Sequence, residues 1–232
     1  MTAPTENRNA LHVDAHAKVG NNSGFADRIM AVLPLPAGST VLEVGCGGAE
    51  LSCALGERYG LDCTGVEPFP IYAPRIDPAR VIKSTAEQLP FDARRFDLVI
   101  AKDVLEHVDD VERTLDEMLR VSRKYVYLMS PNYLFPYEAH FKVPYPPLLP
   151  KWLGRLYLRL FGFTTEQIGF LGHIQYVTKP RLLRALRRSS QQADVLAVID
   201  LQLAKRFRRW GALRPALDMV LNDKVEFLIV KK

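Results

Sequence analysis

One stretch near the start of the chain decides the fold: Val41-Leu42-Glu43-Val44-Gly45-Cys46-Gly47-Gly48-Ala49-Glu50. Its first four residues predict a buried strand, and the glycines that follow predict a tight turn into a helix over residues 50–59. Glycine tolerates positive φ and lets a ligand approach the backbone closely. The helix N-terminus behind the turn offers free N–H groups. The stretch therefore predicts a ligand site at a strand–turn–helix junction.

The next strand, predicted over residues 62–66, is followed by an acid. Glu67 lies 22 residues after Gly45, where dinucleotide-binding folds place the carboxylate that binds ribose hydroxyls. A G-x-G-x-x-G motif would have its third glycine at position 50, but Glu50 stands there and would repel a pyrophosphate. Glu43 adds negative charge near the turn and suits a cationic ligand such as a sulfonium. The residues favour a nucleoside-bearing cation over a dinucleotide.

Outward from this unit, strands alternate with helices. We predict strands at 40–44, 62–66, 80–83, 96–101, 125–129, 195–199 and 224–230, and helices at 25–33, 50–59, 111–121 and 179–188. This alternation predicts a doubly wound α/β fold with a parallel sheet. Asp97 is interpreted as the anchor of a strand end.

We expect one domain over residues 1–232, with three departures from the regular pattern. Residues 1–24 predict an N-terminal arm, and residues 202–222 a basic insertion before the last strand. Residues 131–177 interleave prolines with aromatic residues. A long segment of this kind inside a domain is usually functional, so we expect it on the substrate side.

Composition excludes several classes of protein. The 232 residues are 48% hydrophobic and 25% charged, as in a soluble globular domain rather than a disordered or fibrous chain. No apolar run reaches the ~18 residues of a spanning helix, and the start lacks the apolar core of a signal peptide. Three cysteines without a CxxC pair favour a cytoplasmic location. The histidines and acids lack ligand spacing, so no metal site is expected.

Positive charge is concentrated in residues 151–214, which hold 13 Lys and Arg against three acidic residues. This segment indicates an anionic partner, either phosphate, a membrane surface or nucleic acid, or else a solvated basic face. On a helix over residues 150–161, Lys151, Arg155 and Arg159 form one stripe beside an apolar one. That pattern fits an interfacial helix on anionic lipid, although a lid helix packed on its own domain has the same stripe. Residues 205–210 are a second candidate.

Four motifs carry a resemblance to a known family. Residues 43–47, 86–91, 96–100 and 104–108 resemble, in order and spacing, the motifs of class I S-adenosylmethionine-dependent methyltransferases of the small-molecule type. The resemblance covers roughly residues 38–130. It implies a Rossmann-like, doubly wound, seven-stranded sheet, mostly parallel with an antiparallel last strand, and S-adenosyl-L-methionine as cofactor.

The resemblance also implies a set of cofactor contacts. The Gly45–Gly47 backbone should pass under the methionine part, Glu67 should hold the ribose, Ala86 should lie against the adenine, and the Ala101 carbonyl should meet the cofactor amino group. The expected cofactor-binding residues are Glu43, Gly45, Cys46, Gly47, Glu67, Pro68, Thr85, Ala86, Glu87 and Ala101. Two positions depart from the family pattern: Thr85 replaces a frequent Asp, and Ala49 a frequent glycine.

Candidate catalytic residues lie mainly in the 131–177 segment. Displacement at a sulfonium needs alignment of the reactants, and a base only if the acceptor must lose a proton, as a hydroxyl does. We expect His140 or His173 as the general base, with Glu138 orienting a partner; structural hydrogen bonding is the alternative. Glu106 and His107 are interpreted as opening a helix, where His107 caps or packs.

These features predict a methyltransferase that acts at oxygen on a small-molecule or lipid- or glycan-linked acceptor by direct displacement, with peripheral contact with an anionic membrane. An RNA methyltransferase using residues 151–214 is one alternative, disfavoured because the aromatic residues lie in the proline-rich insertion. A non-catalytic cofactor-binding partner protein is another. The sequence leaves methylation at oxygen, carbon and nitrogen open, as well as the oligomeric state.

Overall fold

The computed structural model describes residues 22–69, 80–146, 148–201, 220 and 222–232. Nearly all of the expected N-terminal arm (1–24) and of the basic insertion (202–222), with its candidate stretch 205–210, lies outside the described residues. Within the described ranges, no helix combines the length and apolarity needed to cross a membrane.

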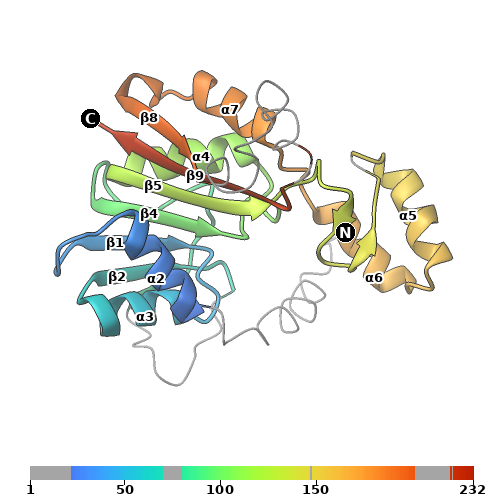
Figure 1. The fold of residues 1–232 in the computed structure, drawn as a ribbon, viewed down its shortest axis with the longest axis horizontal. Helices are drawn as coiled ribbons and strands as arrows, with labels where there is room; N and C mark the ends of the chain where they lie inside the picture. Colours follow the sequence, from blue (N-terminus) through green and yellow to red (C-terminus); the bar gives the residue numbers. More distant parts are fainter. Residues whose placement is uncertain (1–21, 70–79, 147, 202–219, 221) are drawn as a thin grey trace, which may run out of the picture. The chain divides into compact units, whose positions relative to one another are not determined.

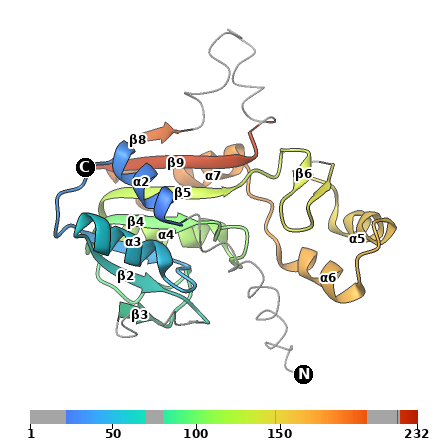
Figure 2. The same cartoon turned by 60° about the horizontal axis from the view of Figure 1, so that its bottom comes forward.

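Seven strands form the central sheet, in the order β3-β2-β1-β4-β5-β9-β8 (Figure 1, with β3 labelled in Figure 2). They are β1 (Thr40–Val44), β2 (Asp62–Val66), β3 (Val81–Ile82), β4 (Phe96–Lys102), β5 (Ser122–Pro131), β8 (Val195–Asp200) and β9 (Lys224–Lys231). β1 pairs with β2, and β2 with β3, in parallel, whereas β8 and β9 are antiparallel. The predicted α/β sheet, mostly parallel with an antiparallel last strand, is confirmed.

Three predicted helices match residue for residue. They are α3 (Glu50–Tyr59), α4 (Val111–Val121) and α7 (Lys179–Arg188), whereas α2 spans Asn22–Val32 instead of the expected 25–33. Residues in the left-handed conformation, Ala49 and Gly60, bound α3 at its two ends. The hydroxyl of Thr178 caps α7 by accepting from the backbone N–H of Arg181 at 3.3 Å. The agreement reflects start and stop signals that are local in sequence.

The 131–177 segment contains more regular structure than its composition indicates. It holds the antiparallel pair β6 (Tyr137–Glu138) and β7 (Val143–Pro144), helices α5 (Lys151–Leu160) and α6 (Thr165–Phe170), and the short 3-10 helix η3 (Leu171–His173). Figure 2 shows α5 and α6 side by side, as in Figure 1. A capping box between Thr164 and Gln167 starts α6. Gly154 lets α5 lie directly against Tyr145, because a Cβ at position 154 would overlap the hydroxyl of Tyr145.

Contacts within the chain define two compact units, residues 1–100 with 117–125 and residues 101–116 with 126–232. Each unit buries its own apolar side chains, including Leu42, Leu55 and Leu98 in the first and Leu105 and Phe227 in the second. A second short 3-10 helix, η4 (Gln192–Asp194), precedes β8 in the second unit. The expectation of one domain over 1–232 stays a prediction.

Asp97 fastens strand ends within the first unit. Its Oδ2 accepts from the backbone N–H and from the hydroxyl of Thr40, both at 2.9 Å, and its Oδ1 accepts from Arg123 at 2.7 Å. Partial burial raises the pKa of Asp97, but the bonds from Thr40 and the charge of Arg123 lower it by more, so the pKa lies below its ordinary value. The anchoring role predicted for Asp97 is confirmed.

Replacing this carboxylate should therefore destabilise the fold in a pH-dependent way. We expect Asp97→Asn to lower the melting temperature by about 2–4 °C at pH 7, because a loss of about 1 kcal/mol shifts a domain of this size by that amount. Because the folded-state pKa is depressed, this stabilisation is present above the unfolded pKa of about 3.9 and is lost as pH falls through the folded value. Thermal denaturation from pH 2 to pH 7 measures the difference.

Asp62→Asn is the matched control, since Asp62 pairs with Arg80 on the surface with 56% of its side chain exposed. Exposed pairs of this kind contribute little. Equal melting temperatures for Asp97→Asn and the wild type at pH 7, or a difference undiminished at pH 2, would contradict the anchoring role.

Candidate cofactor and acceptor sites

The glycine turn is tied to the end of β2. Gly45 and Gly47 have φ of 66° and 53°, in the left-handed region that favours glycine. The backbone N–H groups of Gly45 and Cys46 both donate to the carbonyl of Val66, at 2.8 and 3.1 Å. The turn expected under the methionine part of the cofactor is therefore held at the carboxyl edge of the sheet, where open α/β folds bind ligands.

Glu67 lies directly beside this turn. Its Oε2 accepts from the N–H of Gly47 at 3.0 Å and its Oε1 from the N–H of Phe69 at 3.2 Å. The two parallel strands β1 and β2 end at the same edge, which brings together residues that are 20 positions apart. A half-buried carboxylate at this place has the chemistry to accept hydrogen bonds from a ribose diol, so the residues present fit the expected cofactor.

Glu43 supports the turn from inside the protein. The carboxylate is buried, and its Oε2 accepts from the backbone N–H of Ser52 at 2.9 Å and from the hydroxyl of Ser52 at 2.6 Å. It therefore fastens β1 to the first turn of α3. Burial, with the charges of Glu43 and Glu67, raises the pKa of the Cys46 thiol far above its usual range, so Cys46 is a neutral side chain in the turn.

The segment expected to meet the adenine is held by the end of α4. Arg120 donates to the carbonyls of Phe91 and Leu89 at 2.7 and 3.0 Å, and Glu117 accepts from the N–H of Leu89 at 2.9 Å. Sequence reasoning misses this pair of positioning residues; their signal is an opposite-charge pair three residues apart on one helix. The hydrogen bonds of Glu117 and Arg120 fix the backbone of residues 89–91, three residues beyond Ala86.

The remaining expected cofactor residues differ in exposure. Ala86 is buried, Pro68 and Glu87 are half-buried, and Thr85 is exposed. Ala101 is fully buried in β4 and belongs to the second unit. Their contacts with the cofactor stay predictions.

In the second unit, the structure brings together two of the three candidate catalytic residues. Glu138, on β6, is buried and its Oε1 lies 2.8 Å from Nδ1 of His140. Oε2 of Glu138 accepts from the N–H of Phe141 at 2.7 Å, which fixes the carboxylate. His173 lies on η3 with an exposed side chain. The geometry therefore separates His140, held by a buried acid, from His173.

The surroundings of His140 change its pKa in opposite directions. Burial lowers the pKa of the imidazole, whereas the bond with Glu138 and the negative charges of Glu138, Glu106 and Asp103 raise it by more in total. The pKa of His140 therefore lies above its ordinary value.

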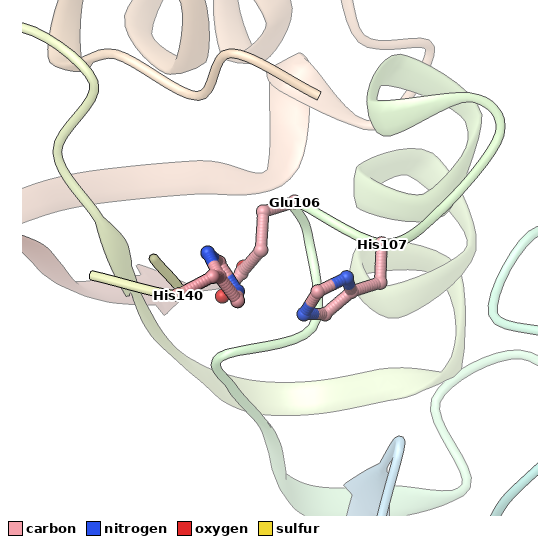
Figure 3. A group of neighbouring side chains, drawn as sticks. All are labelled: Glu106, His107 and His140. Carbon is pink, nitrogen blue, oxygen red and sulfur yellow. The ribbon is translucent and has the colours of Figure 1, made fainter. Parts of the chain in front are cut away.

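Glu106 and His107 do not open a helix, so that prediction is wrong. They lie in the loop between β4 and α4, and α4 begins at Val111, because Asp110 accepts from the N–H of Arg113 at 2.9 Å and caps the helix there. The His107 ring meets the His140 ring edge to face, with centroids 5.2 Å apart and planes at 84°. Figure 3 shows Glu106, His107 and His140 as one group of side chains.

The seven-stranded sheet with an antiparallel last strand, and the glycine turn and acid at its carboxyl edge, fit the class of S-adenosyl-L-methionine-dependent methyltransferases. A family model described as a methyltransferase domain matches residues 20–222. The chain therefore belongs to the methyltransferase domain family.

Known proteins with similar sequences match parts of the chain. An uncharacterized protein of Mycobacterium tuberculosis (strain H37Rv) is 31% identical over 163 residues, covering 57% of this chain and 53% of that protein. The chain thus spans about half the length of this relative. The ubiquinone biosynthesis O-methyltransferase of Azorhizobium caulinodans is 42% identical over 82 residues, 32% of each chain.

Solved structures share the fold. Geranyl diphosphate methyltransferase in complex with S-adenosyl-L-methionine aligns with a TM-score of 0.54 and 15% identity, covering 90% of this chain and 84% of that chain. Haemonchus contortus phosphoethanolamine N-methyltransferase 2 aligns with a TM-score of 0.57 and 14% identity, covering 91% and 52%. At this level of identity the likeness establishes the fold.

The glycine turn offers a direct test of the cofactor site through Gly65 in β2. A Cβ at Gly65 would lie 2.5 Å from Sγ and 3.0 Å from Cβ of Cys46, so Gly65→Ala must displace the turn. Overpacking of this kind costs about 1–3 kcal/mol. We expect at least about tenfold weaker binding of S-adenosyl-L-methionine, measured by isothermal titration calorimetry.

Gly56→Ala is the matched control, because a Cβ at Gly56 would meet only the Leu61 carbonyl at an ordinary 3.5 Å. That variant should bind the cofactor as the wild type does. If Gly65→Ala is folded by circular dichroism and binds the cofactor with unchanged affinity, the turn is not the cofactor site.

Proposed function

We propose that the protein transfers the methyl group of S-adenosyl-L-methionine to a hydroxyl oxygen of a small-molecule or lipid- or glycan-linked acceptor, by direct displacement. The observation that carries the proposal is the Glu138–His140 pair, a half-buried imidazole held by a buried carboxylate in the 131–177 segment. Relatives named ubiquinone biosynthesis O-methyltransferase, from Azorhizobium caulinodans and a Methylobacterium strain, support oxygen as the accepting atom.

The pair suits an acceptor whose reacting atom carries a proton. Displacement at the methyl group depends mainly on alignment, which positioning alone can favour by about 7 kcal/mol or more. A hydroxyl acceptor must also be oriented and must lose its proton, and an imidazole fixed by a carboxylate is a group that does this in enzymes. Glu138 would hold the ring of His140 while the ring contacts the hydroxyl. The general-base role of His140 or His173 stays a prediction.

Loss of the imidazole should reduce turnover without affecting the cofactor. We expect His140→Ala to lower kcat at least about 100-fold, within the range for a positioned acid–base group, with the dissociation constant of S-adenosyl-L-methionine unchanged. Labelled cofactor and a panel of phenols, sugars and isoprenoid alcohols provide the assay.

His173→Ala tests the second candidate in the same assay, and the structure favours the larger loss in His140→Ala. Unchanged turnover in both variants would remove the histidines from the mechanism. Transfer to amines or carbon acceptors in place of alcohols would contradict O-methylation.

We also propose that α5 contacts an anionic membrane surface, which would suit a lipid-linked acceptor. Trp152, Leu156 and Leu160 lie four residues apart on α5, with 71%, 52% and 80% of their surface exposed. The neighbouring Arg155 and Arg159 are exposed, and α5 has no acidic residue. Lys151 of the expected basic stripe instead donates to the Gly172 carbonyl at 2.7 Å. An apolar stripe beside arginines is the pattern of a helix that lies on anionic lipid.

Vesicle co-sedimentation tests this surface. The protein should sediment with phosphatidylglycerol-containing vesicles and less with pure phosphatidylcholine, and added salt should weaken the binding. The double variant Trp152→Ser/Leu160→Ser should lose most of it. Leu183→Ser removes an exposed leucine from α7 and should leave binding intact; equal binding by the double variant would refute the role of α5.

A further inference from the structure

Three potential ligand side chains gather in the second unit. Glu106 and His107 come from the loop between β4 and α4, and His140 comes from the loop between β6 and β7 (Figure 3). Each offers a ligand atom that lies within 4.8 Å of the other two. Atoms bound to one transition-metal ion at about 2.0–2.2 Å can be at most about 4.4 Å apart. Small side-chain adjustments therefore suffice to place one ion among them.

The surroundings of Glu106 give separate support for a cation at this place. The residue is fully buried, and its Oε2 accepts from the hydroxyl of Ser130 at 2.9 Å. Its Oε1 is buried and has no hydrogen-bond partner among the residues that the structure describes. A buried carboxylate oxygen without a partner is costly. A cation between Glu106 and the two rings would supply the missing partner.

Hydrogen bonds from neighbouring residues fix the orientation of two of the three side chains, His140 and Glu106, as is usual for metal ligands. Nδ1 of His140 bonds to Glu138, and a ligating histidine usually donates its other ring N–H to a carboxylate in this way. With Nδ1 protonated, the lone pair of Nε2 is available to an ion. Glu138 is itself fixed by the N–H of Phe141, and Ser130 orients Glu106.

The charges around the cluster also favour a cation. Asp103, Glu106 and Glu138 contribute negative charge near His140. The amino group of Lys224 lies 2.6 Å from Asp103. Burial and the charge of Asp103 raise the pKa of the Glu106 carboxyl to about 7, although the charges of His140 and Lys224 also act on Glu106 and lower its pKa by less.

We propose that Glu106, His107 and His140 bind one divalent transition-metal ion, such as Zn²⁺ or Mn²⁺. Two imidazoles and one carboxylate are a donor set that such ions accept, with further coordination positions left open. The absence of a metal site expected from spacing along the chain is thereby revised. The ligands come from two loops that only the folded chain brings together.

The role of the ion in catalysis rests on the proposed O-methyl transfer, whereas its binding does not. A hydroxyl bound at an open position of the ion would ionise more readily, because a bound cation lowers the pKa of its oxygen ligand. In the metal-loaded protein His140 would hold the ion instead of contacting the hydroxyl, and the proton released by the acceptor would pass to solvent water.

Titration of the metal-free full chain with Zn²⁺, and separately with Mn²⁺, tests the site without cofactor or acceptor. Isothermal titration calorimetry should show one equivalent of at least one ion. Glu106→Gln, His107→Ala and His140→Ala should each weaken binding about 100-fold or more, and Glu138→Gln about 10- to 100-fold, as for a residue that orients a ligand. His173→Ala, which removes an exposed histidine, should retain wild-type affinity.

Affinity for S-adenosyl-L-methionine, unchanged in each variant, serves as the check on folding. No binding of either ion by the wild type, or equal binding by the wild type and all three ligand variants, would overturn the proposal. Methyl transfer to alcohols with and without the ion is measured separately. Metal binding without transfer would refute the proposed function alone, whereas transfer without metal binding would refute this inference alone.

Discussion

The carbonyl of Val66 accepts hydrogen bonds from two successive N–H groups, those of Gly45 and Cys46, and the cofactor side of the protein depends on this junction. The turn can close on β2 only because Gly45 and Gly47 adopt positive φ and because Gly65 has no side chain where Cys46 packs. Glu67 then reaches the N–H of Gly47. The acid and the glycine backbone thus form one arrangement, set by two adjacent parallel strands.

Contacts behind the turn make this arrangement rigid. Glu43 is buried, but the N–H and hydroxyl of Ser52 satisfy one of its oxygens, and the link fixes β1 against α3. Glu117 and Arg120 fix the backbone of Leu89 and Phe91 in a similar way. Preorganised contacts of this kind keep a binding site in shape before the ligand arrives, which is why residues that need not touch the cofactor matter for it.

The second unit contains two buried carboxylates that differ in their hydrogen-bond partners. Glu106 and Glu138 are both removed from solvent, although buried carboxylates are costly unless partners compensate them. Glu138 has its partners in His140 and the N–H of Phe141, whereas one oxygen of Glu106 has none among the described residues. Buried ionisable groups gathered in one cluster are typical of functional sites. The proposed O-methyl transfer rests on the Glu138–His140 pair, and the proposed metal site rests on the Glu106 oxygen that is unpaired within the part of the chain that the structure describes.

The sequence by itself determined the seven strands of the central sheet, the helices between them, the glycine turn and the place of Glu67, but not β6, β7 and α6. Hydrophobic periodicity, caps and glycines act within a few residues, and strands that run parallel end at one edge. The association of Glu106 and His107 with His140, and the hold of Glu117 and Arg120 on residues 89–91, were decided by the tertiary structure. These contacts join segments far apart in the chain, and packing of the folded protein, rather than spacing along the sequence, sets which side chains meet.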